Sequence, residues 1–224
     1  MQGSDAAACH KARKKELTKQ SYKKTANTWQ SLVGGAMVSA GATMNNFQLI
    51  RPNVQYLEEI RDYREESLRD VSSKEDFIYG SAGLHNFENP ACWIEHCKLL
   101  EKSETLPDNT FVESDAYLFV QGKRILGMIN CRRRLDNYFS TIGGHIGFSV
   151  RPSERGKGYG SKMLAMALYR YRELGFDKVL VTCVSENIAS RKIIIANGGV
   201  FESTLLDKSD GSIMERYWIN VNVE

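Results

Sequence analysis

The sequence predicts an α/β domain: a mixed, mostly antiparallel central sheet of about six or seven strands with helices on both faces. Short runs with alternating apolar residues, typical of strands, are interspersed with longer segments whose apolar residues recur at the 3.6-residue period of a helix. Glycine-containing, Asn-Pro and Asp-Asn sites mark turns between them. At 224 residues, the chain is long enough to form a domain with a sizeable core.

Turn and cap residues place the elements of the first half. Pro52 ends the first strand because proline has no N–H for the sheet, and Asn89-Pro90 supplies an N-cap followed by proline at the first helical position. Gly122 lies in a polar turn that predicts a hairpin. The expected elements are a strand at Phe47–Arg51, helices at Val54–Leu68 and Asn89–Lys102, and paired strands at Asp115–Val120 and Ile125–Cys131.

The second half begins with an expected strand at Tyr138–Val150, followed by a glycine-rich turn and an amphipathic helix. The apolar stripe of this helix, at 3.6-residue spacing, contains Met163, Leu164, Ala167, Leu168, Tyr171 and Leu174. The remaining expected elements are a strand at Val179–Val184, a helix at Asn187–Asn197, a strand from Val200 onward and a closing strand at Ile213–Val223.

The composition is that of a soluble globular protein, with 42% apolar and 25% charged residues and no apolar run as long as a membrane span. The five cysteines are odd in number and have no C-x-x-C spacing, which argues against a disulfide framework or a zinc site. No metal is therefore expected, and a reducing cytoplasm is the predicted location.

Residues 1–43 differ in composition from the rest of the chain. They hold seven Lys and Arg against two Asp and Glu, so the net charge of +3 arises in this segment and the remainder is slightly acidic. A Lys-rich start and a Gly/Ala-rich stretch after Ser31 predict a flexible tag-and-linker extension or a mis-assigned upstream start, with residues 44–224 forming a single domain. A nucleic-acid- or partner-binding arm is the alternative.

The most informative stretch is Gly143–Gly160, GGHIGFSVRPSERGKGYG, in which a strand leads through a glycine-rich turn into the helix. Gly156, Gly158 and Gly160 allow a ligand to approach the backbone, and the first helical amides have no partner within the helix. These amides and the helix dipole favour an anion, and two basic residues in the turn add positive charge. The stretch therefore predicts a phosphate-binding turn.

Two common phosphate-binding motifs do not fit this turn. A Walker A loop needs four residues between its glycines and then Gly-Lys-Ser or Gly-Lys-Thr, which the sequence lacks. A dinucleotide fingerprint needs G-x-G-x-x-G and an acidic residue about 20 residues later. The spacing here is G-x-G-x-G, and the next strand brings no acidic residue before Glu186.

The pattern Arg-x-x-Gly-x-Gly at residues 155–160 resembles the coenzyme A pyrophosphate loop of the GNAT superfamily of N-acetyltransferases. The Asn-x-x-Ser at 187–190 and the glycine pair at 198–199 match positions at the two ends of a family helix. The resemblance extends from Asn46 to the C-terminus and looks closest to a group of predicted bacterial acetyltransferases whose strand reads GGHIGY-x-[VI]RPSER. It implies a GNAT-like fold, in which the first two helices and the segment between them wall the cleft for the amine substrate.

The resemblance also implies acetyl-CoA as cosubstrate and direct transfer of its acetyl group to a primary amine. In the resembled fold, the strand before the turn parts from the next strand, the pantetheine arm lies in the opening, and backbone N–H groups of the strand hold the oxyanion. The expected acetyl-CoA contacts are Phe148, Ser149, Val150, Arg155, Gly156, Lys157, Gly158, Tyr159, Gly160, Asn187 and Ser190.

A general base would have to take a proton from the amine, whose pKa is ordinarily about 10.4. His145 is the first candidate, because it lies on the central strand where relatives often carry Glu and its ordinary pKa of about 6.5 suits proton transfer at neutral pH. A hydrogen-bonded structural role for this histidine has equal weight, and Glu113 is the second candidate base. Many family members use a tyrosine seven residues after the motif asparagine as general acid, but Ile194 occupies that position here.

The leading hypothesis is an acetyl-CoA-dependent N-acetyltransferase that acts on a small-molecule or peptide amine. The alternative is a non-catalytic GNAT-like module that binds acetyl-CoA or an amine, since the tyrosine is missing. Nucleic-acid binding through the basic leader and Arg132–Arg134 is disfavoured, because the rest of the chain is slightly acidic. No membrane association is expected, and the resemblance implies that a homodimer can form.

Overall fold

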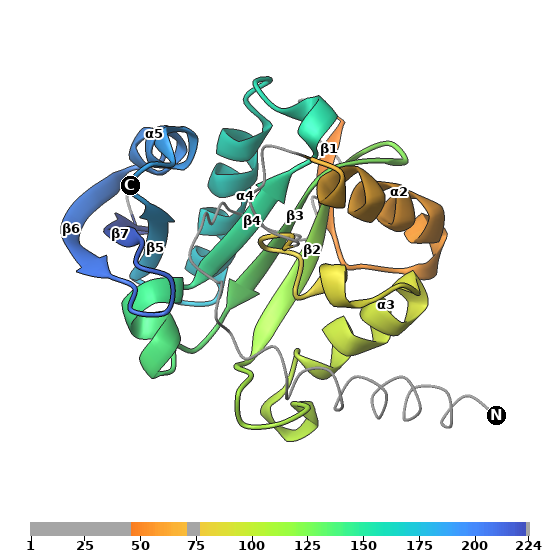
Figure 1. The fold of residues 1–224 in the computed structure, drawn as a ribbon, viewed down its shortest axis with the longest axis horizontal. Coiled ribbons are helices and arrows are strands. Elements are labelled where there is room, and N and C mark those ends of the chain that lie inside the picture. Colours follow the sequence, from red (N-terminus) through yellow and green to blue (C-terminus); the bar gives the residue numbers. More distant parts are fainter. Residues whose placement is uncertain (1–45, 71–76, 223–224) are drawn as a thin grey trace.

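The computed structural model describes residues 46–70 and 77–222. Within them, seven strands form two sheets in which every pairing is antiparallel. The central sheet consists, in order, of β1 (Phe47–Ile50), β2 (Ser114–Gln121), β3 (Arg124–Arg132) and β4 (Ile146–Val150) (Figure 1). The second sheet consists, in order, of β5 (Lys178–Val184), β7 (Ile213–Asn220) and β6 (Gly199–Leu206). The expected α/β class and number of strands are confirmed, although the strands divide between two sheets.

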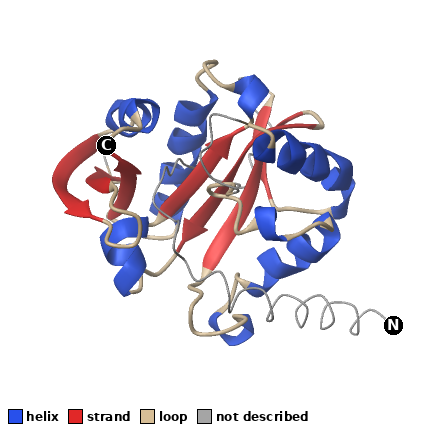
Figure 2. Ribbon diagram, in the orientation of Figure 1, coloured by secondary structure: helices blue, strands red, loops and turns tan. Residues whose placement is uncertain are grey.

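Helices cover both faces of the central sheet (Figure 2). α2 (Leu57–Leu68) and α3 (Pro90–Leu99) lie on one face, α4 (Tyr159–Glu173) lies on the other, and α5 (Ile188–Ala196) packs on the second sheet. The predictions for residues 1–43 fall outside the described residues.

The central sheet separates two apolar cores. Ile129 and Phe148 pack with Met163 of α4 on one face, whereas Met128 packs with Tyr63 of α2 on the other. The alternation of residues along β3 therefore assigns odd-numbered side chains from Ile129 onward to the α4 face and even-numbered ones from Met128 onward to the α2/α3 face. This assignment determines which side chains of β3 lie beside the candidate site.

The prediction of a single strand at Tyr138–Val150 is wrong for its first part. Its first part is a short π-helical turn, Phe139–Gly143, and only Ile146–Val150 forms a strand. Asp136 caps the turn by accepting a hydrogen bond from the Phe139 N–H at 2.7 Å, and Arg216 donates to two of the turn's carbonyl oxygens. These polar contacts outweigh the alternating apolar pattern that indicated a longer strand.

The remaining expectations concern disulfide bonds and membrane-spanning helices. Cys97, Cys131 and Cys183 are buried free thiols. Cys92 is disulfide-bonded, which the odd number of cysteines and their spacing did not lead us to expect. No helix within residues 46–70 and 77–222 is both long enough and apolar enough to cross a membrane.

Candidate active site

β4 and β5 diverge next to the glycine-rich turn. They meet where the His145 N–H donates to the Leu180 carbonyl oxygen at 2.8 Å, and the two strands do not pair beyond that point. On its other edge, β4 is paired with β3. The two residues that flank β4 continue this pairing: the His145 carbonyl oxygen accepts the Arg132 N–H, and the Arg151 N–H donates to the Leu126 carbonyl oxygen. Because antiparallel bonding alternates, the N–H and C=O groups of Ile146, Phe148 and Val150 face the diverging edge. This open edge contains the backbone groups of two predicted acetyl-CoA contacts.

The glycine-rich turn leads from β4 into α4 as the sequence predicts. Gly156 and Gly158 have φ angles of 78° and 76°, and a Cβ added to either would meet no atom within 4 Å. Gly158 is the N-cap of α4 and has no side chain, so it supplies no capping hydrogen bond to the amides of the first helical turn, including those of Tyr159 and Gly160. The turn therefore combines a helix start that its N-cap residue does not cap, the positive end of the helix dipole and open space around the two glycines, which suits a phosphate.

The two basic residues of the turn have carboxylate partners. Arg155 forms an ion pair with Asp70 at 2.6 Å, and Lys157 forms one with Glu154 at 2.7 Å. About half of each basic side chain is exposed, which keeps both reachable from solvent. An anion bound at the turn would compete with these carboxylates, and its net gain in electrostatic energy would be smaller than that from unpaired cations.

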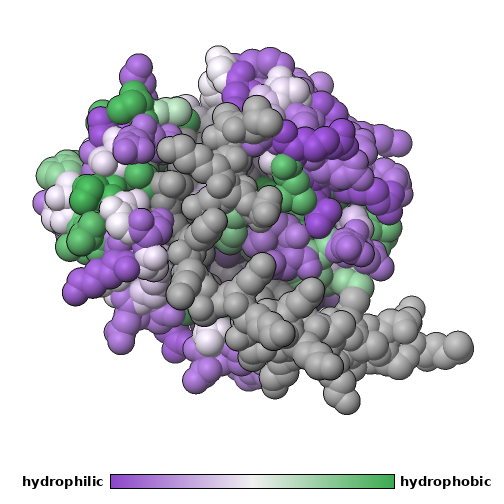
Figure 3. Space-filling model, in the orientation of Figure 1, coloured by the Kyte–Doolittle hydropathy of each residue, from purple (hydrophilic) through white to green (hydrophobic). Residues whose placement is uncertain are grey.

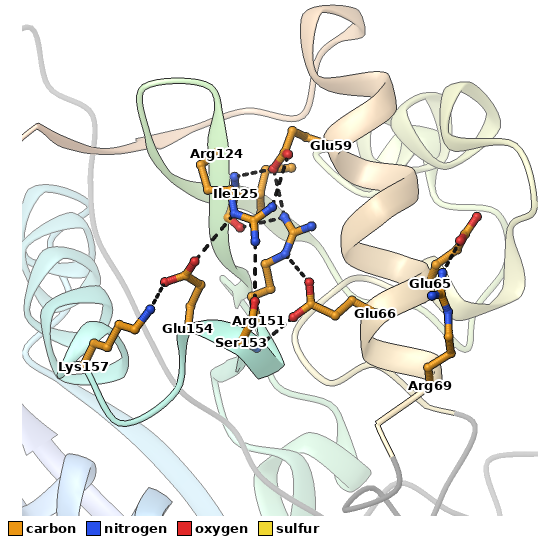
Figure 4. A network of polar contacts seen from close by, with 10 residues as sticks. All are labelled: Glu59, Glu65, Glu66, Arg69, Arg124, Ile125, Arg151, Ser153, Glu154 and Lys157. Atoms are coloured by element: carbon orange, nitrogen blue, oxygen red, sulfur yellow. Dashed lines mark hydrogen bonds and ion pairs between the residues drawn. The ribbon is translucent and has the colours of Figure 1, made fainter.

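A buried arginine fixes the start of the turn to α2 (Figure 4). Arg151 is 2% exposed and donates to Glu66 at 2.6 Å, to Glu59 at 2.9 Å and to the Ile125 carbonyl oxygen at 3.2 Å. Glu66 also accepts the Ser153 N–H at 2.8 Å. The pairing of these carboxylates with Arg151 is not evident from the sequence, although the helix is rich in charged residues and the R-P-S-E-R segment contains the arginine.

The α2/α3 face of β4 is in contact with the segment that joins these two helices. The Tyr63 hydroxyl lies 2.8 Å from Ser149 Oγ, and Ser149 Oγ donates to the Tyr79 carbonyl oxygen at 2.7 Å. Burial raises the pKa of Tyr63 to about 12, so the phenol stays protonated. Gly80 lies so close to β4 that a Cβ there would be 2.1 Å from Phe148 Cα. The side chain of Ser149 is thus held by α2 and the joining segment, while its neighbours present backbone groups to the open edge.

His145 lies where β4 and β5 meet. Its Nδ1 accepts the Leu180 N–H at 2.9 Å, and the rings of Tyr171, Phe176 and Trp218 surround it. Burial, together with the positive charge of Arg132, lowers the pKa of His145 to about 4. At pH 7 the imidazole is therefore neutral with Nδ1 already engaged, which fits the structural role better than the role of general base.

Glu113 precedes β2 at the end of the sheet where β3 finishes and β4 begins. Its side chain accepts the Ser103 N–H at 3.0 Å, which lowers the pKa of the carboxyl, and its backbone oxygen accepts the Arg133 N–H. The glycine-rich turn follows the opposite end of β4. The structure therefore brings the predicted phosphate contacts together but leaves Glu113 apart from them.

Asn187 and Ser190 lie at the start of α5. The Asn187 side chain caps this helix by accepting the Ser190 N–H at 2.9 Å, and Ser190 is fully buried. Arg191 forms a bidentate ion pair with Glu215. Ile194 is fully buried in the core on the α4 face, so no phenol replaces the tyrosine of the family pattern at this position.

The sequence profile of the acetyltransferase (GNAT) family matches residues 57–194, more than half of the chain. The chain therefore belongs to the GNAT acetyltransferase family. A comparison with curated proteins found no match.

Solved structures share this fold. Ribosomal L7/L12 α-N-protein acetyltransferase RimL, in complex with coenzyme A, superposes with a TM-score of 0.61 at 13% identity, over 82% of this chain and 98% of its own. Ribosomal-protein-S5-alanine acetyltransferase from Vibrio fischeri gives 0.59 at 14% identity, over 82% and 98%. Microcin C7 self-immunity acetyltransferase MccE, in complex with acetyl-CoA and AMP, gives 0.58 at 16% identity, over 78% and 92%. At these identities the likeness is one of fold.

Proposed function

We propose that this protein is an N-acetyltransferase that moves the acetyl group of acetyl-CoA directly to a primary amine of a small molecule or peptide. The observation that carries the proposal is the open edge of β4 running into the uncapped N-terminus of α4. Phe148 and Val150 would offer backbone groups to the pantetheine arm and the thioester oxygen, and the amides after Gly158 would hold the pyrophosphate. Family membership and the coenzyme A and acetyl-CoA complexes of proteins with this fold support it.

The chemistry that this arrangement serves is a single acyl transfer. The amine nitrogen attacks the thioester carbon, the oxyanion forms beside the strand amides, and the C–S bond breaks to release coenzyme A as thiolate. The nitrogen loses one proton and the thiolate gains one, so the exchange balances through water. Because Ile194 has no acidic proton and His145 is engaged by Leu180, our mechanism assigns neither transfer to a side chain.

The amine substrate would approach β4 from the face covered by α2 and α3, as the resemblance implies. Proteins with this fold include a ribosomal L7/L12 α-N-protein acetyltransferase and a spermidine N-acetyltransferase, so peptide and small-molecule amines both belong in a substrate panel. A cytoplasmic location remains a prediction, as does a homodimer. For the latter, edge strand β6 offers a suitable surface, because Val200, Phe201 and Leu206 are exposed there and apolar residues gather at the left of Figure 3.

Calorimetric titration with acetyl-CoA, with NAD as the control ligand, tests the proposal. We expect saturable binding by the wild type and its loss in the Arg155→Ala/Gly158→Asp double variant. Gly175→Asp is a matched control: Gly175 ends α4 with a φ of 79° and is equally open, so acetyl-CoA binding should survive there. Asp70→Asn should tighten binding by about twofold, because the partly exposed ion pair with Arg155 is worth roughly 0.5 kcal/mol.

Turnover is measured separately as thiol release with a panel of primary amines. Thiol release that depends on an amine supports the transferase. Acetyl-CoA binding without thiol release across the panel would favour the non-catalytic module instead. Absence of acetyl-CoA binding, or binding that persists in the double variant, would contradict the assignment of the turn.

A further inference from the structure

Asn130 is a buried polar residue of β3 whose side-chain oxygen has no partner. The residue is 7% exposed, and its Oδ1 is buried without a hydrogen bond. Four other buried side-chain atoms among the described residues have no conventional hydrogen bond, but two of them, in Arg51 and Asp70, form ion pairs with Glu101 and Arg155. The other two belong to Arg64 and Asp207, whose side chains make a hydrogen bond through another atom. Asn130 therefore differs from them, because its unpaired oxygen belongs to an uncharged side chain that no ion pair holds in place.

The position of Asn130 relates it to β4. Its side chain points to the same face as Met128, which packs with α2 and α3. Its neighbours across the sheet are Gly147 of β4 and Ala116 of β2, so neither neighbouring strand places a large side chain beside the carboxamide. Gly147 directly precedes Phe148, whose N–H faces the open edge of β4. Asn130 thus lies about one strand spacing from that edge, since hydrogen-bonded antiparallel partners have Cα atoms about 5.5 Å apart.

Other polar groups on this face have partners within the protein. Ser149 and Tyr63 contact each other, and Arg132 donates to the Gly144 carbonyl oxygen and lies over the Phe139 ring. A buried oxygen left unpaired beside such groups loses its hydration without compensation, unless a ligand supplies a donor. The reaction proposed above would supply one, because its amine substrate carries N–H groups and would approach β4 from this face, beside the Gly80 backbone that packs against Phe148.

The charge near Asn130 favours one form of this amine. Arg132 lies two residues along β3 on the same face and is buried. Its positive charge contributes to the lowered pKa of His145. A second cation at this face would meet the same repulsion, whereas a neutral amine would not. The neutral amine is also the form whose lone pair attacks the thioester.

We propose that Asn130 is a specificity-determining residue that binds the nitrogen of the amine substrate by accepting its N–H at Oδ1. This inference rests on the proposed function. It assigns to Asn130 the recognition of an uncharged primary amine on the α2/α3 face of β4, while the thioester lies at the open edge. The free lone pair of the nitrogen is then available for attack, because the hydrogen bond uses only an N–H.

The test replaces the carboxamide by an apolar group of similar size, in Asn130→Leu, with Asn130→Ala as a second, smaller replacement. Steady-state thiol release is measured with spermidine and with an alanine-initiated peptide, and acetyl-CoA affinity and Tm are measured alongside. We expect KM for the amine to rise roughly 10- to 100-fold. Acetyl-CoA affinity should be unchanged in both variants, and the Tm of Asn130→Leu should stay equal or rise because an unpaired buried oxygen has been removed. Met128→Leu, a volume-conserving change on the same face, should leave the amine KM unchanged.

The outcomes separate this inference from the proposed function. If the wild type releases thiol with neither amine, the transferase assignment for these amine classes fails, and the role of Asn130 fails with it. If the wild type turns over and both variants keep the wild-type KM, only the role of Asn130 is overturned. A raised KM accompanied by a lower Tm in Asn130→Leu, by weaker acetyl-CoA binding or by the same effect in Met128→Leu would assign Asn130 to the fold and would also overturn the proposal.

Discussion

Replacing Glu66 by Gln should reveal how strongly α2 holds the phosphate-binding turn. In the wild type, Glu66 accepts the Arg151 guanidinium at 2.6 Å and the Ser153 N–H at 2.8 Å. Gln keeps the shape and one acceptor oxygen but removes the negative charge opposite Arg151. The substitution therefore isolates the charge-assisted part of the contact, which is the stronger part.

The expected loss of folding free energy in Glu66→Gln follows from the pKa of the Glu66 carboxyl group. Burial alone would raise the pKa of Glu66, but hydrogen bonds from Arg151 and Ser153 outweigh it and bring the pKa to about 2. A shift of this size from the usual value corresponds to roughly 3 kcal/mol of stabilisation. Because 28% of the side chain is exposed, solvent screening reduces our expectation to about 2 kcal/mol for Glu66→Gln at pH 7.

The dependence on pH gives the sharper test. A carboxyl whose pKa is lower in the folded state stabilises fully above its unfolded pKa and loses this contribution as pH falls toward the folded value. The wild type's advantage over Glu66→Gln should thus be constant from pH 7 to about 5 and should shrink below about 4.5, by at most about 1.4 kcal/mol per pH unit. Urea denaturation of both proteins across this range measures it.

Glu65→Gln is the matched control, because Glu65 is the neighbouring residue and, among the residues that the structure describes, its side chain pairs with Arg69 across one exposed helical turn (Figure 4). We expect it to cost at most about 0.5 kcal/mol. A Glu66→Gln deficit that stays the same from pH 7 to 3.5, or that equals the Glu65→Gln deficit, would refute the reasoning.

Two further predictions concern the backbone beside the site and its histidine. Gly80→Ala should lower the free energy of unfolding by about 3 kcal/mol or more, because its Cβ would lie 2.1 Å from Phe148 Cα. Gly122 has a similar φ of 59° but lies in open space, so Gly122→Ala should lower the free energy of unfolding by only about 1 kcal/mol. Equal losses in urea denaturation would contradict this packing. The His145 ring, followed by NMR, should titrate near pH 4, and stability should decline as pH falls from about 6.5 toward 4, since the unfolded imidazole binds the proton first. A midpoint near 6.5 would restore His145 as a candidate base.

The local signals predicted the elements around the site well. The Asn89-Pro90 cap begins α3, and the Asn187 cap begins α5, because a side-chain acceptor next to the first helical amides acts within a few residues of sequence. The glycine-rich turn was predictable for the same reason: positive φ at Gly156 and Gly158 and an uncapped helix start follow from the residue types themselves.

Contacts between distant segments were not predictable in this way. The two sheets approach each other where His145 and Leu180, 35 residues apart, are hydrogen-bonded, but β4 and β5 do not pair. The orphaned oxygen of Asn130 is likewise invisible in the sequence, because it results from what the neighbouring strands place beside it. The resemblance suggested a base at His145, but burial and the Leu180 amide determine what that imidazole can do.

One face of α2 links both parts of the proposed site. Three residues of α2 and one just beyond its C-terminal end recur at helical spacing: Glu59, Tyr63, Glu66 and Asp70. They contact Arg151, Ser149, the Ser153 N–H and Arg155, respectively. Hydropathy assigns the three acidic residues among them to solvent, so the sequence indicated an ordinary amphipathic helix. In the structure these residues instead make polar contacts with the glycine-rich turn and the segment that begins it. Because the same rigid helix holds the phosphate-binding turn and the Ser149 region of β4, a change in its position on binding acetyl-CoA would be transmitted to the face where we place the amine.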